Sequence, residues 1–144
     1  MAYATKADLE NYIPAAAIAG IGDPQIDAAL QDASDEADGY LRAQWTLPLI
    51  EWSNDLTKFV CYIAKYELMS FRGFKPDGTM DVVFADDAKK ARDWLKLVAE
   101  QKVTPNFVDS SSAATTGKTS GTGPKVFSAR SRGFGRPLYP GGGR

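Results

Sequence analysis

The residues from Asp23 to Leu49 place the strongest constraint on how this chain of 144 residues can fold. Apolar residues recur there at steps of four and three, at Ile26, Leu30, Ala33, Ala37, Tyr40 and Leu41. That spacing lines one side of a helix with 3.6 residues per turn, so the stretch predicts an amphipathic helix over residues 23–44. Asp23 is expected to cap the first turn, because Pro24 follows at a position where a missing N–H has no cost.

The opposite side of this helix is acidic. It carries Asp27, Asp32, Asp35 and Asp38, and the only cation near them in the sequence is Arg42. Carboxylates on a single helix fan outward, whereas a hard cation needs about six or more converging oxygens. We therefore expect a solvated or pore-facing acidic surface at these four aspartates, and no metal site.

A second helix is predicted over residues 54–71. The six residues at its centre, 59–64, are all apolar, which is typical of a helix buried on most sides. Lys58 and Lys65 lie seven residues apart and are expected to form its one exposed stripe. Glu67 falls among the apolar positions, so we expect it to pair with an arginine or to reach a subunit boundary.

The last helix is predicted over residues 81–102, where apolar residues again recur at steps of four and three and Asp86 can pair with Lys90 on the exposed side.

Near the N-terminus, Thr5 and Asp8 have the spacing of a capping box, which predicts a short helix through Tyr12. The apolar residues of 46–52 predict a loop that packs onto the core. The expected fold class is all-α: a small bundle of three principal helices plus a short N-terminal helix.

The charge of the chain divides it into two regions. Residues 1–102 hold 11 Lys or Arg against 17 Asp or Glu, a net charge of −6, whereas residues 103–144 hold 6 against 1, a net charge of +5. We expect a helical body over 1–102 and a long extended arm over 103–144, which begins with a linker. Its basic and aromatic residues are Phe127, Arg130, Arg132, Phe134, Arg136 and Tyr139. A basic arm favours an acidic surface on another copy or another protein.

Enzymatic chemistry is not expected from this composition. The chain has no histidine, which removes the commonest general base and metal ligand. Its single cysteine, Cys61, lies in the apolar centre of a predicted helix, where a structural role is favoured over a nucleophile. We expect no catalytic residue, no cofactor and no metal. Apolar runs are also too short to span a membrane, and no export signal is expected.

Four segments, in order along the chain, resemble the head-tail connector (adaptor) proteins of tailed bacteriophages, of the Mu-like type. The main one is Tyr40-Leu41-Arg42 followed by Trp45-Thr46-Leu47-Pro48-Leu49. The others are the N-terminal Tyr3 to Leu9, the helix Ala88 to Val103, and Val126-Phe127-Ser128 with Arg130. These motifs are signatures of packing and assembly, and none of them is catalytic.

The resemblance implies a structural virion protein. Such a subunit would form a ring, of twelve copies in that family, and would be assembled in the host cytoplasm and placed in the neck of the virion between capsid and tail. Its partners would be the portal protein and a tail or stopper protein, with DNA passing through the lumen. The arm residues are then expected to contact the portal or a neighbouring subunit, and the four aspartates of helix 23–44 to line the channel.

One alternative remains open from the residues themselves. Aromatic side chains among arginines can stack on bases, so the arm could bind single-stranded nucleic acid. The acidic body argues against it, because it would repel phosphates. Salt-sensitive binding to single-stranded DNA would favour this alternative, whereas ring formation with portal would favour the connector.

Overall fold

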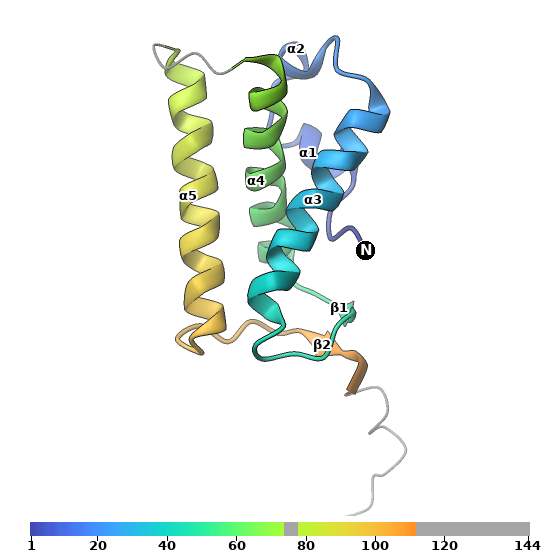
Figure 1. Ribbon diagram of the computed structural model, residues 1–144, viewed down its shortest axis with the longest axis vertical. Helices are drawn as coiled ribbons and strands as arrows, with labels where there is room; N and C mark the ends of the chain where they lie inside the picture. Colours follow the sequence, from blue (N-terminus) through green and yellow to red (C-terminus); the bar gives the residue numbers. More distant parts are fainter. Residues whose placement is uncertain (74–77, 112–144) are drawn as a thin grey trace, which may run out of the picture. The chain divides into compact units, whose positions relative to one another are not determined.

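The computed structural model describes residues 1–73 and 78–111 of the chain (Figure 1). Its elements in chain order are α1 (Lys6–Glu10), α2 (Ala15–Ile18), α3 (Asp23–Leu41), β1 (Leu49–Glu51), α4 (Asn54–Arg72), α5 (Thr79–Ala99) and β2 (Val108–Asp109). The prediction of a mostly helical body with three principal helices and a short N-terminal helix is confirmed. The small sheet was not predicted.

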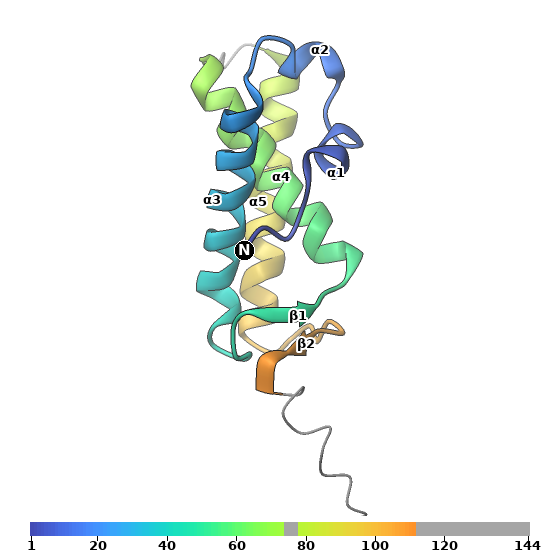
Figure 2. The same cartoon turned by 90° about the vertical axis from the view of Figure 1, so that its right-hand side faces the viewer.

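Helix α4 is the central element of the bundle. It packs against α5 on one side and against α3 and α1 on the other, and the two views agree on this arrangement (Figures 1 and 2). Its apolar side chains belong to one continuous core with those of the other helices, whose members include Leu9, Ile18, Ile26, Leu30, Leu41, Leu56, Val60, Ile63, Leu68, Phe84, Leu95 and Val98. The neighbours on several sides explain why the centre of α4 is apolar almost all round.

The helix ends follow local hydrogen bonding. The capping box of α1 is present: the Thr5 N–H donates to Asp8 Oδ2 at 2.8 Å, and the Asp8 N–H donates to Thr5 Oγ1 at 3.3 Å. For α3 the prediction that Asp23 is the cap is wrong. Gly22 is the cap, and its N–H donates to Gln25 Oε1 at 3.0 Å. Helix α3 ends at Leu41, three residues before the predicted end.

The segment after α3 contains a short strand where a loop was expected. Strand β1 pairs with β2 in antiparallel orientation, with Leu49 opposite Asp109. The buried Asp109 carboxylate strengthens the pairing, because its Oδ2 accepts a hydrogen bond from the Thr46 N–H at 3.0 Å. Beside it, the rings of Trp45 and Phe107 meet edge to face at 5.2 Å. The residues that follow α5 are thus attached to the body as far as β2.

The Lys65 side chain lies inside the bundle, so the prediction that it joins an exposed stripe with Lys58 is wrong. Its side chain is only 3% exposed, and its Nζ donates to Asp87 Oδ2 of α5 at 2.7 Å. The ammonium group also lies 4.3 Å from the ring centre of Tyr62 and 4.8 Å from that of Phe84. Asp87, one helix away, is what makes burial of this lysine possible.

Candidate functional site

The acidic surface of α3 is present, and its members differ in their surroundings. Asp27, Asp32 and Asp35 are exposed, whereas Asp38 is partly buried. Asp35 accepts a hydrogen bond from Gln31 Nε2 at 2.8 Å. Asp27 and Asp32 have no hydrogen bond or ion pair to any other residue that the structure describes. We call Asp27, Asp32 and Asp35 the acidic face.

Asp38 belongs to a buried hydrogen-bond network and not to the acidic face. The Tyr3 hydroxyl donates to Asp38 Oδ1, and burial followed by this hydrogen bond raises the pKa of Tyr3 above its ordinary value. The backbone of Tyr3 is held as well: its N–H donates to Ser34 Oγ at 3.0 Å, and its carbonyl accepts from Trp52 Nε1 and Thr57 Oγ1. No local pattern in the sequence could have predicted these contacts, which join residues 31 to 54 positions apart.

Glu36, on the same helix as the acidic face, pairs with Arg92 of α5, although Arg42 is the cation nearest to it in the sequence. Arg92 forms a bidentate pair with Glu36, with Nε to Oε1 at 2.6 Å and Nη2 to Oε2 at 2.9 Å. Two parallel charge-assisted bonds fix the orientation of both side chains and tie α3 to α5.

Glu67 of α4 lies partly buried near this pair. Burial, and then the charges of Asp32 and Glu36, raise the pKa of Glu67, while Arg92 acts in the opposite direction. Glu67 makes no hydrogen bond or ion pair with an arginine among the described residues, where Arg92 is engaged by Glu36. Its predicted place at a subunit boundary stays a prediction.

We expect Glu67→Gln to stabilise the protein at pH 7. A raised pKa means that the folded state binds the proton of Glu67 more tightly than the unfolded state does, so ionisation costs stability as the pH rises above about 4.5. Glutamine keeps the size of the side chain and removes that cost. Thermal unfolding at several pH values should show a higher Tm for the variant at pH 7 and a difference that shrinks as the pH falls below 4.5.

Glu36→Gln is the control for this prediction, since it removes one partner of the bidentate pair and should lower the Tm at pH 7. The interpretation of Glu67 is wrong if Glu67→Gln lowers the Tm at pH 7 by as much as Glu36→Gln does.

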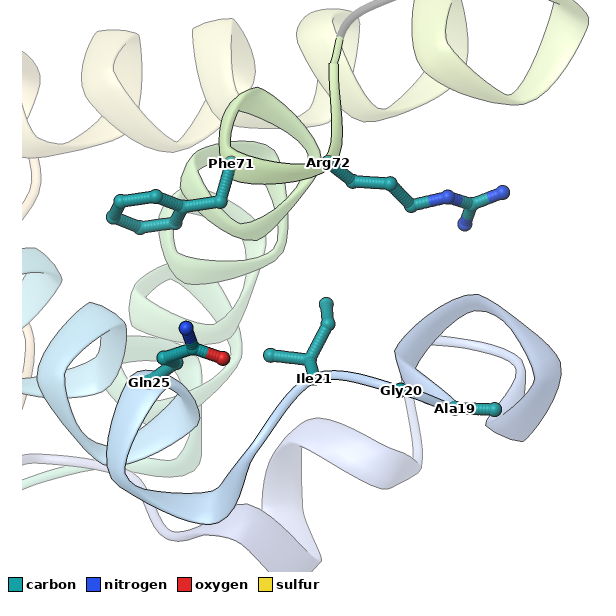
Figure 3. Close-up of a pocket in the computed structure, with 6 residues that line it drawn as sticks. All are labelled: Ala19, Gly20, Ile21, Gln25, Phe71 and Arg72. Atoms are coloured by element: carbon teal, nitrogen blue, oxygen red, sulfur yellow. The ribbon is translucent and has the colours of Figure 1, made fainter.

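A pocket of about 340 Å³ lies at the end of the bundle where α4 ends (Figure 3). It is lined by Ala19, Gly20, Ile21, Gln25, Phe71 and Arg72. Phe71 is 70% exposed, and one Arg72 nitrogen, Nη1, donates to the Ala17 carbonyl at 3.2 Å. Gly20 turns the chain between α2 and α3 with a φ of +98°, which favours glycine. Its described lining combines an apolar wall with a guanidinium and includes no carboxylate.

Metal binding and thiol chemistry find no support among residues 1–73 and 78–111. No group of acidic or cysteine side chains there could hold a metal ion, and no helix there is long and apolar enough to cross a membrane. Cys61 is fully buried, and burial raises the pKa of its thiol to about 12. A thiol with that pKa stays protonated near neutral pH and is a poor nucleophile.

The predicted arm contacts lie outside the described residues. They are Phe127, Arg130, Arg132, Phe134, Arg136 and Tyr139, and they stay predictions.

A family of known proteins matches most of this chain. No curated protein matches the chain significantly. The family described as Bacteriophage Mu, Gp36 matches residues 3–122, which include every helix and both strands of the body. The match ends before the segment Val126 to Arg130, so it does not extend to the basic part of the arm. Because it covers most of the chain, this protein belongs to the bacteriophage Mu Gp36 family.

Proposed function

We propose that this phage protein is a head-tail connector (adaptor) subunit. In this proposal several copies form a ring in the neck of the virion, where the ring docks on the portal protein and provides the surface to which a tail or stopper protein attaches. Membership of the Mu Gp36 family supports a phage component. The more specific role rests on the features of the body described below.

The observation that carries the proposal is the set of large apolar side chains on the surface of the body. Phe71, Met80, Val82 and Val83 are 45–70% exposed, and all four lie near the end of α4 or the start of α5. Large apolar side chains that stay exposed at one end of a small protein mark surfaces that other proteins cover. Self-assembly and docking are functions that use such a surface.

The acidic face gives the ring a suitable channel wall. DNA must pass through a connector, and cations on the wall would bind its phosphates and release their counterions, which would hold the DNA in place. Asp27, Asp32 and Asp35 carry negative charge at exposed positions, and two of them have no partner among the described residues. We propose that these residues line the lumen and that the arm contacts the portal or a neighbouring copy.

Electron microscopy of the purified full chain, alone and mixed with portal protein, tests this function. We expect closed rings that bind the portal at one end. A chain that stays monomeric and ignores portal would contradict the proposal. Salt-sensitive binding of the full chain to single-stranded DNA, without rings, would instead support the nucleic-acid-binding alternative.

A further inference from the structure

Two exposed surfaces lie at the same end of the bundle, where α4 ends and α5 begins. The first, which we call the pocket face, consists of Ile21, Phe71 and Arg72 at the pocket of Figure 3. The second, which we call the α5 ridge, consists of Val82, Val83 and Asp86 near the start of α5. Val82 is 45% exposed and Val83 is 52% exposed. Both surfaces combine apolar side chains with one charged group.

The α5 ridge points away from the rest of its own bundle. Phe84, Ala88 and Ala91 are the buried residues of this part of α5. On a helix of 3.6 residues per turn, residues 82, 83 and 86 lie on the side opposite to those positions. The ridge is therefore a convex outer edge of the body.

The pocket face lies on the other side of α4. Figure 1 shows α5 on one side of α4, and α2 with the start of α3 on the other, at the end where α4 stops. The two surfaces of one copy are thus turned away from each other, and α4 separates them.

The ridge of one copy can, however, meet the pocket face of the next copy at the same height along the bundle. Contacts between two different surfaces are the kind that generates a ring when the rotation closes.

The charged groups of the two surfaces are complementary, and neither has an ion pair with a residue of 1–73 or 78–111. The Arg72 guanidinium donates one hydrogen bond, to the Ala17 carbonyl, and contacts no carboxylate among the described residues. Asp86 has no ion pair in that part of the chain either. The predicted pair of Asp86 with Lys90 is wrong, because Lys90 Nζ lies 3.6 Å from Asp87 Oδ1 instead.

We propose that the α5 ridge of one copy inserts into the pocket face of the next copy around the ring. Val82 and Val83 then pack against Ile21 and Phe71, and the Asp86 carboxylate accepts hydrogen bonds from Arg72. Burial of the apolar side chains supplies the attraction, and the ion pair selects the register and the partner surface. This inference rests on the proposed ring-forming function and names the contact that would close the ring.

Charge exchange between the two surfaces tests the contact in the full-length chain. Arg72→Glu and Asp86→Arg each place like charges together, so each variant alone should assemble about a hundredfold more weakly than the unaltered protein, as measured by sedimentation and electron microscopy. The double variant restores opposite charges at every contact and should form rings again. An equimolar mixture of the two single variants should also form rings, with the variants alternating, because each copy contributes one pocket face and one ridge.

Asp93→Arg is the matched control, since it reverses an exposed aspartate of the same helix away from the ridge and should assemble normally. Circular dichroism will confirm that every variant is folded. If the unaltered chain forms rings and the folded single variants assemble equally well, the proposed contact is wrong while the connector function stands. Folded single variants that lose assembly without rescue in the double variant would exclude the pairing of Asp86 with Arg72. An unaltered chain that forms no ring, with or without portal, would contradict the function and the contact together.

Discussion

Asp87→Ala is expected to destabilise the body by about 3 kcal/mol, the lower end of the range for breaking a buried ion pair. The variant leaves the Lys65 ammonium, 3% exposed and 2.7 Å from the lost carboxylate, without its counter-charge. The lower end applies because Asp87 itself is 17% exposed, so water can partly replace it. A small domain has only about 5–15 kcal/mol of stability in total, and the Tm should fall by roughly 10 °C or more. Urea and thermal unfolding followed by circular dichroism measure both quantities.

Asp93→Ala is the matched control, because this aspartate of the same helix is exposed and its ion pair with Lys96, at 3.9 Å, is exposed as well. We expect a change within about 0.5 kcal/mol for it. The double variant Lys65→Met with Asp87→Leu should recover most of the lost stability, since apolar side chains of similar size avoid the burial of charge altogether. Equal losses in Asp87→Ala and Asp93→Ala would show that the buried pair contributes nothing.

Lysine at all three positions of the acidic face is expected to slow DNA ejection strongly without preventing ring assembly. If Asp27, Asp32 and Asp35 line the channel, the substitutions replace a repelling wall by one that binds phosphates, and the effect is repeated in every copy around the ring. The retention should weaken as salt is added, because binding through phosphates falls steeply with salt concentration. Charges act on DNA only within about 10 Å in 0.1 M salt, so only the channel wall matters. Ejection kinetics from assembled particles, measured at several salt concentrations, test this expectation.

Two further variants sharpen this test. The corresponding asparagine variant removes the charge without reversing it and should give an intermediate rate. Lysine at Asp93, an exposed residue of α5, controls for a general change in surface charge. Asp38 is left unaltered, because it accepts a hydrogen bond from Tyr3 and its loss would disturb the fold. Ejection that is as fast in the lysine variant as in the unaltered protein would overturn the channel assignment, as would a ring structure with the acidic face on its outer wall.

The helices of this protein could be predicted from the sequence because the information is local. Apolar side chains at steps of four and three define α3 and α5, and the capping box of Thr5 and Asp8 marks the start of α1. The ends of the helices could be predicted less well. The cap of α3 is Gly22 and not Asp23, because the Gln25 side chain reaches the Gly22 N–H. Helix α5 ends at Ala99, two residues before Gln101, whose φ is +60°.

The contacts that the sequence did not reveal all depend on partners far along the chain. The sequence around Lys65 predicts a surface residue, because its partner Asp87 lies 22 positions further along the chain. Strand β1 is recognisable only through β2, almost sixty residues away, because three residues alone carry no clear period. The pocket at Phe71 and Arg72 likewise forms only where α4 ends beside the connection from α2 to α3. Such pairings require the three-dimensional arrangement of the helices.

The pairing of β2 with β1 also determines how the body would bear mechanical load. Tension applied to the chain beyond Ser111 reaches β2 first, where the backbone bonds to β1 and the bond from the Thr46 N–H to the Asp109 carboxylate resist it. Strand β1 passes the force to the start of α4, the helix with the most extensive contacts in the bundle. The last turn of α5 is thereby shielded from being pulled open. A subunit held by its C-terminal segment while DNA leaves under pressure could thus be strained without unravelling its outermost helix.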